Sequence, residues 1–189
     1  LQGDFVPHLD ALERLGADTV RVRAPEHLEG VEGVIVPGGE STTMSVLMRR
    51  WNFYAPLRRM IERGVPFLGT CAGSILLSDC VEDPRENVTV EPIGGIDITS
   101  RRNAWGRQVE SFEAPVELTL PGEDPFTVTG VFIRAPRFAD PGEPVEIIGR
   151  LDDGEIVAVR QDNLIAATFH TERTPELRLH KYFLSLIGE

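Results

Sequence analysis

The feature that most constrains the fold is a segment that changes from strand-like to helix-like at a cysteine. Residues 65–77 read VPFLGTCAGSILL, an apolar run, a small-residue turn and a second apolar run. The order Gly69-Thr70-Cys71-Ala72-Gly73 fits the G-x-nucleophile-x-G turn, which joins a strand directly to a helix and is strained enough to need small neighbours. The helix N-terminus would favour the thiolate. This segment predicts a nucleophilic Cys71 at the carboxyl end of a buried strand; the alternative is a buried structural cysteine.

The first part of the chain alternates between helical and extended patterns. Apolar residues recur with helical spacing in 6–17 (Val6, Leu9, Leu12 and Leu15), and Gly16 would end this helix. The same spacing occurs in 44–50, where Ser41–Thr43 offer N-caps, and in 54–64, where Gly64 would end the helix. Residues 18–22 and 31–36 predict strands. Alternating strands and helices with apolar strands indicate an α/β fold in which helices cover both faces of a parallel sheet.

From about Glu91 to Thr168 the pattern becomes rich in short strands separated by turns. We interpret this part as a β-rich extension of the same domain. The predicted strands cover 95–99, 108–114, 116–120, 126–134, 145–151, 156–160 and 164–170, and residues 174–187 predict a closing amphipathic helix.

Length, charge and cysteine content narrow the function. A chain of 189 residues suits one domain, and a net charge of −11 argues against binding to nucleic acids or anionic membranes. No apolar run reaches the roughly 20 residues of a membrane span. If one helix joins Cys71 to Cys80, the two lie too far apart for a disulfide, which fits a cytoplasmic protein, and two cysteines with four scattered histidines form no metal-ligand cluster. The loop-like start LQGD predicts that the first strand lies upstream of residue 1.

A base for Cys71 is found at the end of a later strand. His170 ends the segment LIAATFH, so in a parallel sheet it would lie at the same edge as Cys71. Glu172 follows two residues later and could orient the imidazole. The sequence therefore favours a Cys71–His170–Glu172 triad. His8 and His27 lie in surface-like segments and His180 on the last helix, and each is read as an ordinary histidine.

Two further motifs fit a site for a small carboxylate substrate. The Gly-Gly turn in PGGES, residues 37–41, could place the Gly39 N–H beside that of Ala72 as a pair of oxyanion donors, although a plain helix-start turn would read the same. Arginines follow strand-like segments in 101–107 and at Arg134 and could bind a carboxylate, although a lone arginine is more often a solvated charge.

The motifs taken together resemble one family almost from end to end. LQGD, PGGESTTMSVL, GTCAGSILL, RRNAWGRQVESFEA, VFIRAP and VAVRQDNLIAATFHTE, in this order, are similar to the glutaminase subunits of pyridoxal 5′-phosphate synthase, the PdxT family of class I, triad-type glutamine amidotransferases. The resemblance implies a single flavodoxin-like α/β/α domain over 1–189. It also implies hydrolysis of L-glutamine without metal or cofactor, and a tunnel that passes ammonia to a TIM-barrel synthase subunit (PdxS) in a large hetero-oligomer.

The resemblance also implies roles for individual residues. It places the catalytic triad at Cys71, His170 and Glu172, and Gln2 in a loop near the oxyanion site. Thr171 stands where the family usually has proline, and Trp105 where it has phenylalanine. The glutamine-binding positions map onto Gly39, Glu40, Ser41, Arg102, Ile133 and Arg134.

Three other functions remain open from the sequence. A glutaminase that serves a different synthase would share the GTCAG turn, but the short chain and RRNAWGRQ argue against it. A cysteine hydrolase or peptidase could use the same triad. A scaffold subunit with an inactive site would not need Cys71, His170 and Glu172 together.

Overall fold

The fold is built around one seven-stranded sheet and one small three-stranded sheet. The computed structural model describes residues 2–85, 89–103 and 111–188. The large sheet has the order β1-β2-β10-β9-β8-β5-β6, and the small sheet has the order β3-β4-β7. The large sheet contains β1 (Val34–Val36), β2 (Phe67–Thr70), β10 (Leu164–Ala167), β9 (Ile156–Gln161), β8 (Glu146–Arg150), β5 (Ser111–Leu118) and β6 (Phe126–Ile133). The small sheet contains β3 (Ser78–Glu82), β4 (Ile96–Arg101) and β7 (Arg137–Ala139).

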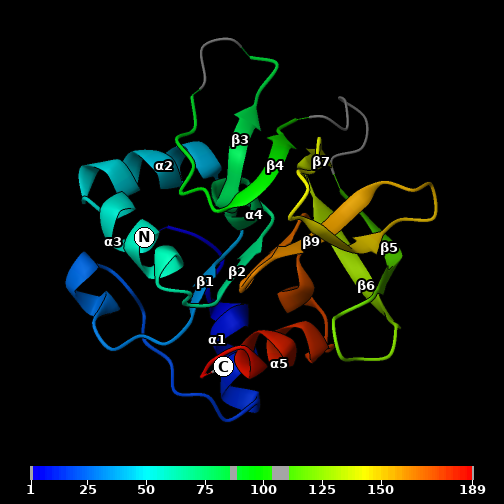
Figure 1. Ribbon diagram of the computed structural model, residues 1–189, viewed down its shortest axis with the longest axis horizontal. Coiled ribbons are helices and arrows are strands. Elements are labelled where there is room, and N and C mark those ends of the chain that lie inside the picture. Colours follow the sequence, from blue (N-terminus) through cyan, green and yellow to red (C-terminus); the bar gives the residue numbers. More distant parts are fainter. Residues whose placement is uncertain (1, 86–88, 104–110, 189) are drawn as a thin grey trace.

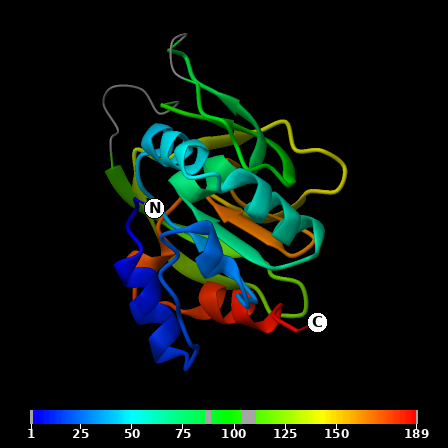
Figure 2. The ribbon, with the colours of Figure 1, turned by 90° about the vertical axis from the view of Figure 1, so that its left-hand side faces the viewer.

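Helices cover both faces of the large sheet. Figure 2 shows α1 and α5 on one side of it and α2 and α3 on the other. The helices are α1 (Val6–Arg14), α2 (Ser41–Arg50), α3 (Tyr54–Glu62), α4 (Ala72–Leu77) and α5 (Arg178–Ser185), with short 3-10 turns η1 (Pro25–Leu28) and η2 (Thr171–Arg173). Successive side chains of β2 point to opposite faces of the sheet, so this strand contributes to two hydrophobic cores. Phe67 packs with α2, α3 and α4, whereas Leu68 packs with α5, β5 and β6.

The three parallel strands at one end of the large sheet bring two distant segments together. β2 pairs in parallel with β1 on one side and with β10 on the other. In this register Thr70 lies opposite Ala167, so the residues that follow β2 and β10 leave the sheet at the same edge. The prediction of a parallel sheet with a β-rich extension is confirmed, and the extension adds four antiparallel strands to the same sheet (Figure 1).

Several predicted elements differ from the observed ones. Residues 18–22 form no strand, and Val20 is 55% exposed. The helix after Cys71 ends at Leu77, and Cys80 lies on β3, where it is exposed and free, as Cys71 also is free. Residues 111–118 form one strand instead of two, because Pro115 is tolerated beside the antiparallel partner β6.

The inward face of α1 also differs from the prediction. Val6 is 53% exposed, whereas His8 and Ala11 are buried. The side of α1 that faces the sheet therefore contains His8 and not Val6. Among the described residues, no helix has the length and apolar character needed to cross a bilayer.

Candidate active site

Cys71 lies in a strained turn between β2 and α4. Its φ of 49° and ψ of −107° are unusual for a residue with a side chain, and such strain persists only where the surroundings hold it. The Cys71 N–H donates to the carbonyl of Ala167 at 2.9 Å, which ties the turn to β10. A methyl group on Gly69 would lie 2.7 Å from the Gly73 carbonyl carbon, and one on Gly73 would overlap the Val36 carbonyl. Both glycines are therefore required by close backbone packing, as predicted.

His170 lies beyond the end of β10, at the same edge of the sheet as Cys71. Its N–H donates to the Val131 carbonyl at 2.9 Å, so β6 fixes its backbone. Its ring packs against Gly38, where a methyl group would lie 3.0 Å from Nδ1 and closer still to Cε1. The Gly-Gly turn thus makes room for the imidazole, a role for Gly38 that sequence reasoning did not assign.

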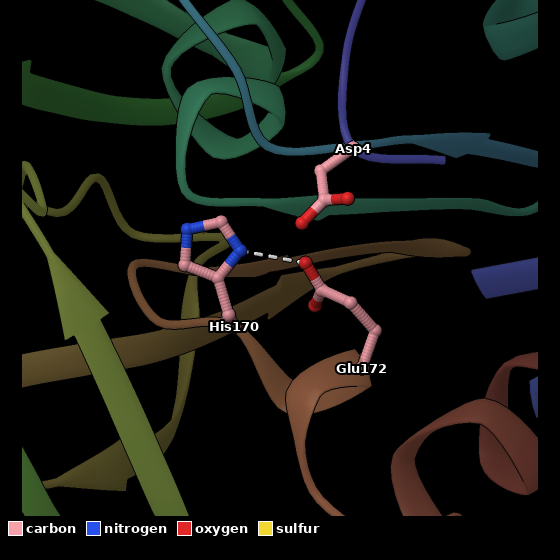
Figure 3. Close-up of side chains that lie close together, drawn as sticks. All are labelled: Asp4, His170 and Glu172. Carbon is pink, nitrogen blue, oxygen red and sulfur yellow. Dashed lines mark hydrogen bonds and ion pairs between the residues drawn. The ribbon is translucent and has the colours of Figure 1, made fainter. Parts of the chain in front are cut away.

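Glu172 orients the imidazole of His170. Figure 3 shows the two side chains facing each other. His170 Nδ1 and Glu172 Oε1 lie 2.6 Å apart and share a hydrogen bond. The side chain of Glu172 is fully buried. The predicted neighbours Cys71, His170 and Glu172 are therefore brought to one edge of the sheet.

Both members of this pair have shifted pKa values. Burial alone lowers the pKa of His170, but hydrogen bonds and charges from Cys71 and Glu172 outweigh it and raise the pKa to about 10. Burial alone raises the pKa of Glu172, but the hydrogen bond and the charge of His170 hold it below the ordinary range. At neutral pH the site therefore contains a protonated imidazole beside an ionised carboxylate.

Asp4 approaches this pair from the N-terminal segment (Figure 3). One oxygen of Asp4, one nitrogen of His170 and one oxygen of Glu172 lie within 4.8 Å of one another, an arrangement that could in principle hold a metal ion. However, His170 and Glu172 are bound to each other, and Asp4 pairs with Arg173. Because these side chains already form ion pairs within the protein, we interpret the group as an ion-pair network.

Ile133 lies beside the nucleophile. Its carbonyl is 3.8 Å from Cys71 Sγ, within the range of a thiol hydrogen bond. The next residue, Arg134, has a φ of 44°, so the chain turns sharply after β6 and leaves the Arg134 side chain exposed. The structure therefore places the Ile133 backbone at the site and Arg134 at its border.

The loop that follows β1 holds three of the predicted glutamine-binding residues. A methyl group on Gly39 would lie 3.2 Å from Gly3 Cα and 3.5 Å from Gln2 Oε1, so the N-terminal segment covers this loop. Glu40, and not Ser41, Thr42 or Thr43, caps α2, because its carboxylate accepts from two backbone N–H groups of the first turn at 3.1 and 2.7 Å. Ser41 is the buried first residue of α2.

Glu40 and Arg102 are linked to each other. Burial alone raises the pKa of Glu40, but the hydrogen bonds from Thr43 and Thr42 lower it to about 2, so its side chain is charged at neutral pH. Arg102 is 7% exposed, and its Nη2 donates to Glu40 at 3.3 Å and to the Thr42 hydroxyl at 3.0 Å. Its Nη1 lies 3.0 Å from Asp83. The Arg102 guanidinium is thus held by the protein's own oxygens.

Ala72 follows the nucleophile directly. Ala72 is the first residue of α4, so its N–H has no acceptor within the helix and remains available to an oxyanion. Trp105 and Arg107 lie outside the described residues.

Two histidines that sequence reasoning set aside lie behind the site. His8 is 3% exposed and His180 is fully buried, and a distance of 3.0 Å separates His8 Nδ1 from His180 Nε2. His8 Nε2 lies 3.5 Å from Glu172 Oε1. The local sequence gives one indication that His8 is buried: it lies one helical turn before Ala11, on the side of α1 that faces the sheet. The apolar stripe of the helix indicated a different inward side.

The fold and the grouped side chains are typical of one class of protein. A thiol on a strand–helix turn, faced by a histidine–glutamate pair at the carboxyl edge of a parallel sheet, is found in α/β enzymes that use a cysteine nucleophile. The model of the SNO glutamine amidotransferase family matches residues 1–189, and the chain belongs to that family.

Individual relatives are similar in sequence to this chain over nearly their whole length. The pyridoxal 5′-phosphate synthase subunit PdxT of Corynebacterium jeikeium is 46% identical over 189 residues, which cover 100% of this chain and 94% of that protein. PdxT of Herpetosiphon aurantiacus is 48% identical over 187 residues, covering 98% and 96%. A crystal structure of a glutamine amidotransferase is 45% identical, with a TM-score of 0.89 over 100% of this chain and 96% of that one. The predicted family and flavodoxin-like fold are confirmed.

Proposed function

We propose that this chain hydrolyses L-glutamine to L-glutamate and ammonia and supplies the ammonia to a synthase subunit that makes pyridoxal 5′-phosphate. The observation that carries the proposal is the convergence of Cys71, His170 and Glu172 at one sheet edge, in a family of glutamine amidotransferases. The PdxT relatives are themselves described as subunits of pyridoxal 5′-phosphate synthase. In this proposal residues 1–189 form a single glutaminase domain.

The proposed reaction has two covalent steps. The Cys71 thiolate attacks the side-chain amide carbon of glutamine, and the N–H groups of Gly39 and Ala72 bind the resulting oxyanion. Protonated His170 gives its proton to the amide nitrogen, the carbon–nitrogen bond breaks, and ammonia leaves. Neutral His170 then removes a proton from water, which attacks the thioester and releases glutamate and the thiolate. These steps use no metal or cofactor, because the thiolate is itself a good nucleophile.

Recognition of glutamine follows from charge. The ionised Glu40, with its pKa of about 2, suits the α-ammonium group, and the exposed guanidinium of Arg134 suits the α-carboxylate. The backbone at Ile133 and Gly39 borders the reacting amide. Arg102 and Ser41 complete the proposed binding set, with Arg102 holding Glu40 in place.

The proposed partner is the TIM-barrel synthase subunit, PdxS, in a large cytoplasmic hetero-oligomer. Ammonia would pass to it through a tunnel, which protects the uncharged molecule from protonation in water. Without the partner we expect weak glutaminase activity, because the partner completes the oxyanion site.

Isotope transfer tests the whole proposal. The chain is mixed with a PdxS subunit, the pentose and triose phosphates and amide-¹⁵N glutamine, and pyridoxal 5′-phosphate is analysed by mass spectrometry. The proposal expects ¹⁵N in the product, and expects Cys71→Ala to abolish synthesis from glutamine but not from added ammonium. Synthesis from glutamine that survives Cys71→Ala would contradict it. Cleavage of peptides in place of glutamine would support a peptidase.

A further inference from the structure

We propose that His8 is a positioning residue of the active site, which holds the Glu172 carboxylate in place behind His170. This inference rests on the proposed function, because it assigns His8 a part in the same reaction. One buried imidazole from α1 bridges the strand that leads to the nucleophile and the turn that carries Glu172.

The contacts of His8 join elements that are remote in the sequence. Its Nε2 lies 3.1 Å from the hydroxyl of Thr70, the residue immediately before Cys71, and 3.5 Å from Glu172 Oε1. Its Nδ1 lies 3.0 Å from Nε2 of His180 on α5. A buried histidine that served only to fill space would not need polar partners on both ring nitrogens.

The unpartnered atoms around His8 indicate where its proton resides. A neutral imidazole has one N–H and one acceptor nitrogen, and His180 Nδ1 is buried without a partner among the described residues. If His8 donated to His180, the His180 proton would have to occupy that unpartnered nitrogen. Buried N–H groups without acceptors are rarer than buried acceptors without donors. We therefore infer that His180 donates to His8, which leaves the His8 Nε2–H directed at Glu172 and Thr70.

Glu172 needs this second donor. Its side chain is fully buried, His170 and His8 both approach its Oε1, at 2.6 and 3.5 Å, and its Oε2 is buried without a hydrogen-bond partner among the described residues. A carboxylate held by a single hydrogen bond could rotate and carry the His170 ring with it. The charged and titratable groups that face Glu172 are His170, His8 and Asp4, with His180 behind His8 and Arg173 bound to Asp4.

The test compares His8→Leu with His8→Gln. Leucine removes the donor, and we expect kcat for glutamine to fall about 10- to 100-fold while KM changes less than about twofold. We also expect the acid limb of the pH–rate profile to move to higher pH, since Glu172 takes up a proton more readily without His8. Glutamine retains an N–H donor and should recover most of the lost rate. His27→Leu, which removes an exposed histidine on η1, should behave like the parent chain.

A second variant tests the contact between His180 and His8. His180→Leu removes only the support of His8, so a smaller effect in the same direction is expected. The double variant should be no slower than His8→Leu alone, because the two residues act through one path. Rates are divided by the fraction of Cys71 that a glutamine-like electrophile can label, which corrects for unfolded protein.

The outcomes separate this inference from the proposed function. The pH dependence of Cys71 alkylation by iodoacetamide, followed by peptide mapping, reports on the thiol and His170 whatever the natural substrate is. An altered alkylation profile in His8→Leu would support the inference even if the parent chain failed to hydrolyse glutamine. Parental kcat and parental pH profiles in His8→Leu, or no recovery in His8→Gln, would overturn it.

Discussion

Replacement of Gly38 by alanine tests whether the imidazole of His170 lies where the structure places it. The new methyl group would lie 3.0 Å from His170 Nδ1, 3.3 Å from Nε2 and nearer still to Cε1. Since carbon atoms in contact prefer about 3.5–4.0 Å, the ring or the loop would have to move by roughly 1 Å. A displacement of this size in a catalytic group can cost about 100-fold in rate, and the overpacking about 1–3 kcal/mol in stability.

The assay for Gly38→Ala is glutamate release in the presence of the synthase subunit, together with urea unfolding. Gly16→Ala is the control, because Gly16 has a φ of 77° with nothing within 4 Å of the added methyl group. The control should lose about 1–2 kcal/mol of stability and keep its activity. If Gly38→Ala retained the parental kcat, the imidazole could not pack against Gly38 in the active enzyme, and the reasoning would be refuted.

Three further predictions follow from the same site. A glutamine-like electrophile should label Cys71 and spare the exposed Cys80, which peptide mapping will show; labelling of Cys80 alone would sink the assignment of the nucleophile. Glu172→Gln should lower kcat by about 10³- to 10⁴-fold and bring the pKa of His170 down from about 10, as measured by NMR titration; an unchanged pKa would mean that Glu172 does not support the imidazolium. Burial and, next, His8 lower the pKa of His180 from 6.5 to about 4, so the unfolded chain binds the proton more readily. This contribution to stability is complete above about pH 6.5 and falls by roughly 3 kcal/mol as the pH drops toward 4, and urea unfolding should show a smaller loss in His180→Leu.

The sequence predicted the part of the site that depends on short-range order. Gly69 and Gly73 flank Cys71 because the turn leaves no room for larger residues, and this requirement is visible in five consecutive letters. The position of His170 also followed from a general rule, since parallel strands end at one edge. Both inferences needed only the local pattern and the direction of the strands.

The rest of the site depends on contacts that no local pattern encodes. His8 is buried because α1 docks beside η2, more than 160 residues later, and the spacing of Val6, Leu9 and Leu12 suggested a different inward face. The capping role of Glu40 was missed for a related reason. Ser, Thr and Asp are the usual caps, and only the observed turn shows that the longer carboxylate reaches the N–H groups of α2.

The boundary between α4 and β3 also depends on a distant contact. The sequence suggests a helix that continues from Cys71 to Cys80, through the residues of β3, because the apolar run gives no sign of where the helix ends. In the structure Ser78 takes an extended conformation and its hydroxyl bonds Ser100 on β4 at 2.7 Å. The strand therefore exists because of a partner strand, β4, that the local sequence does not reveal.

The central claim is that Cys71, supported by His170 and Glu172, releases ammonia from glutamine. The most direct measurement is glutamate formation from L-glutamine by the purified chain, with and without the synthase subunit, for the parent and for Cys71→Ala. We predict weak release by the chain alone, strong release with the partner, and a loss of several orders of magnitude in Cys71→Ala. No release with the partner present, or undiminished release by Cys71→Ala, would contradict the account.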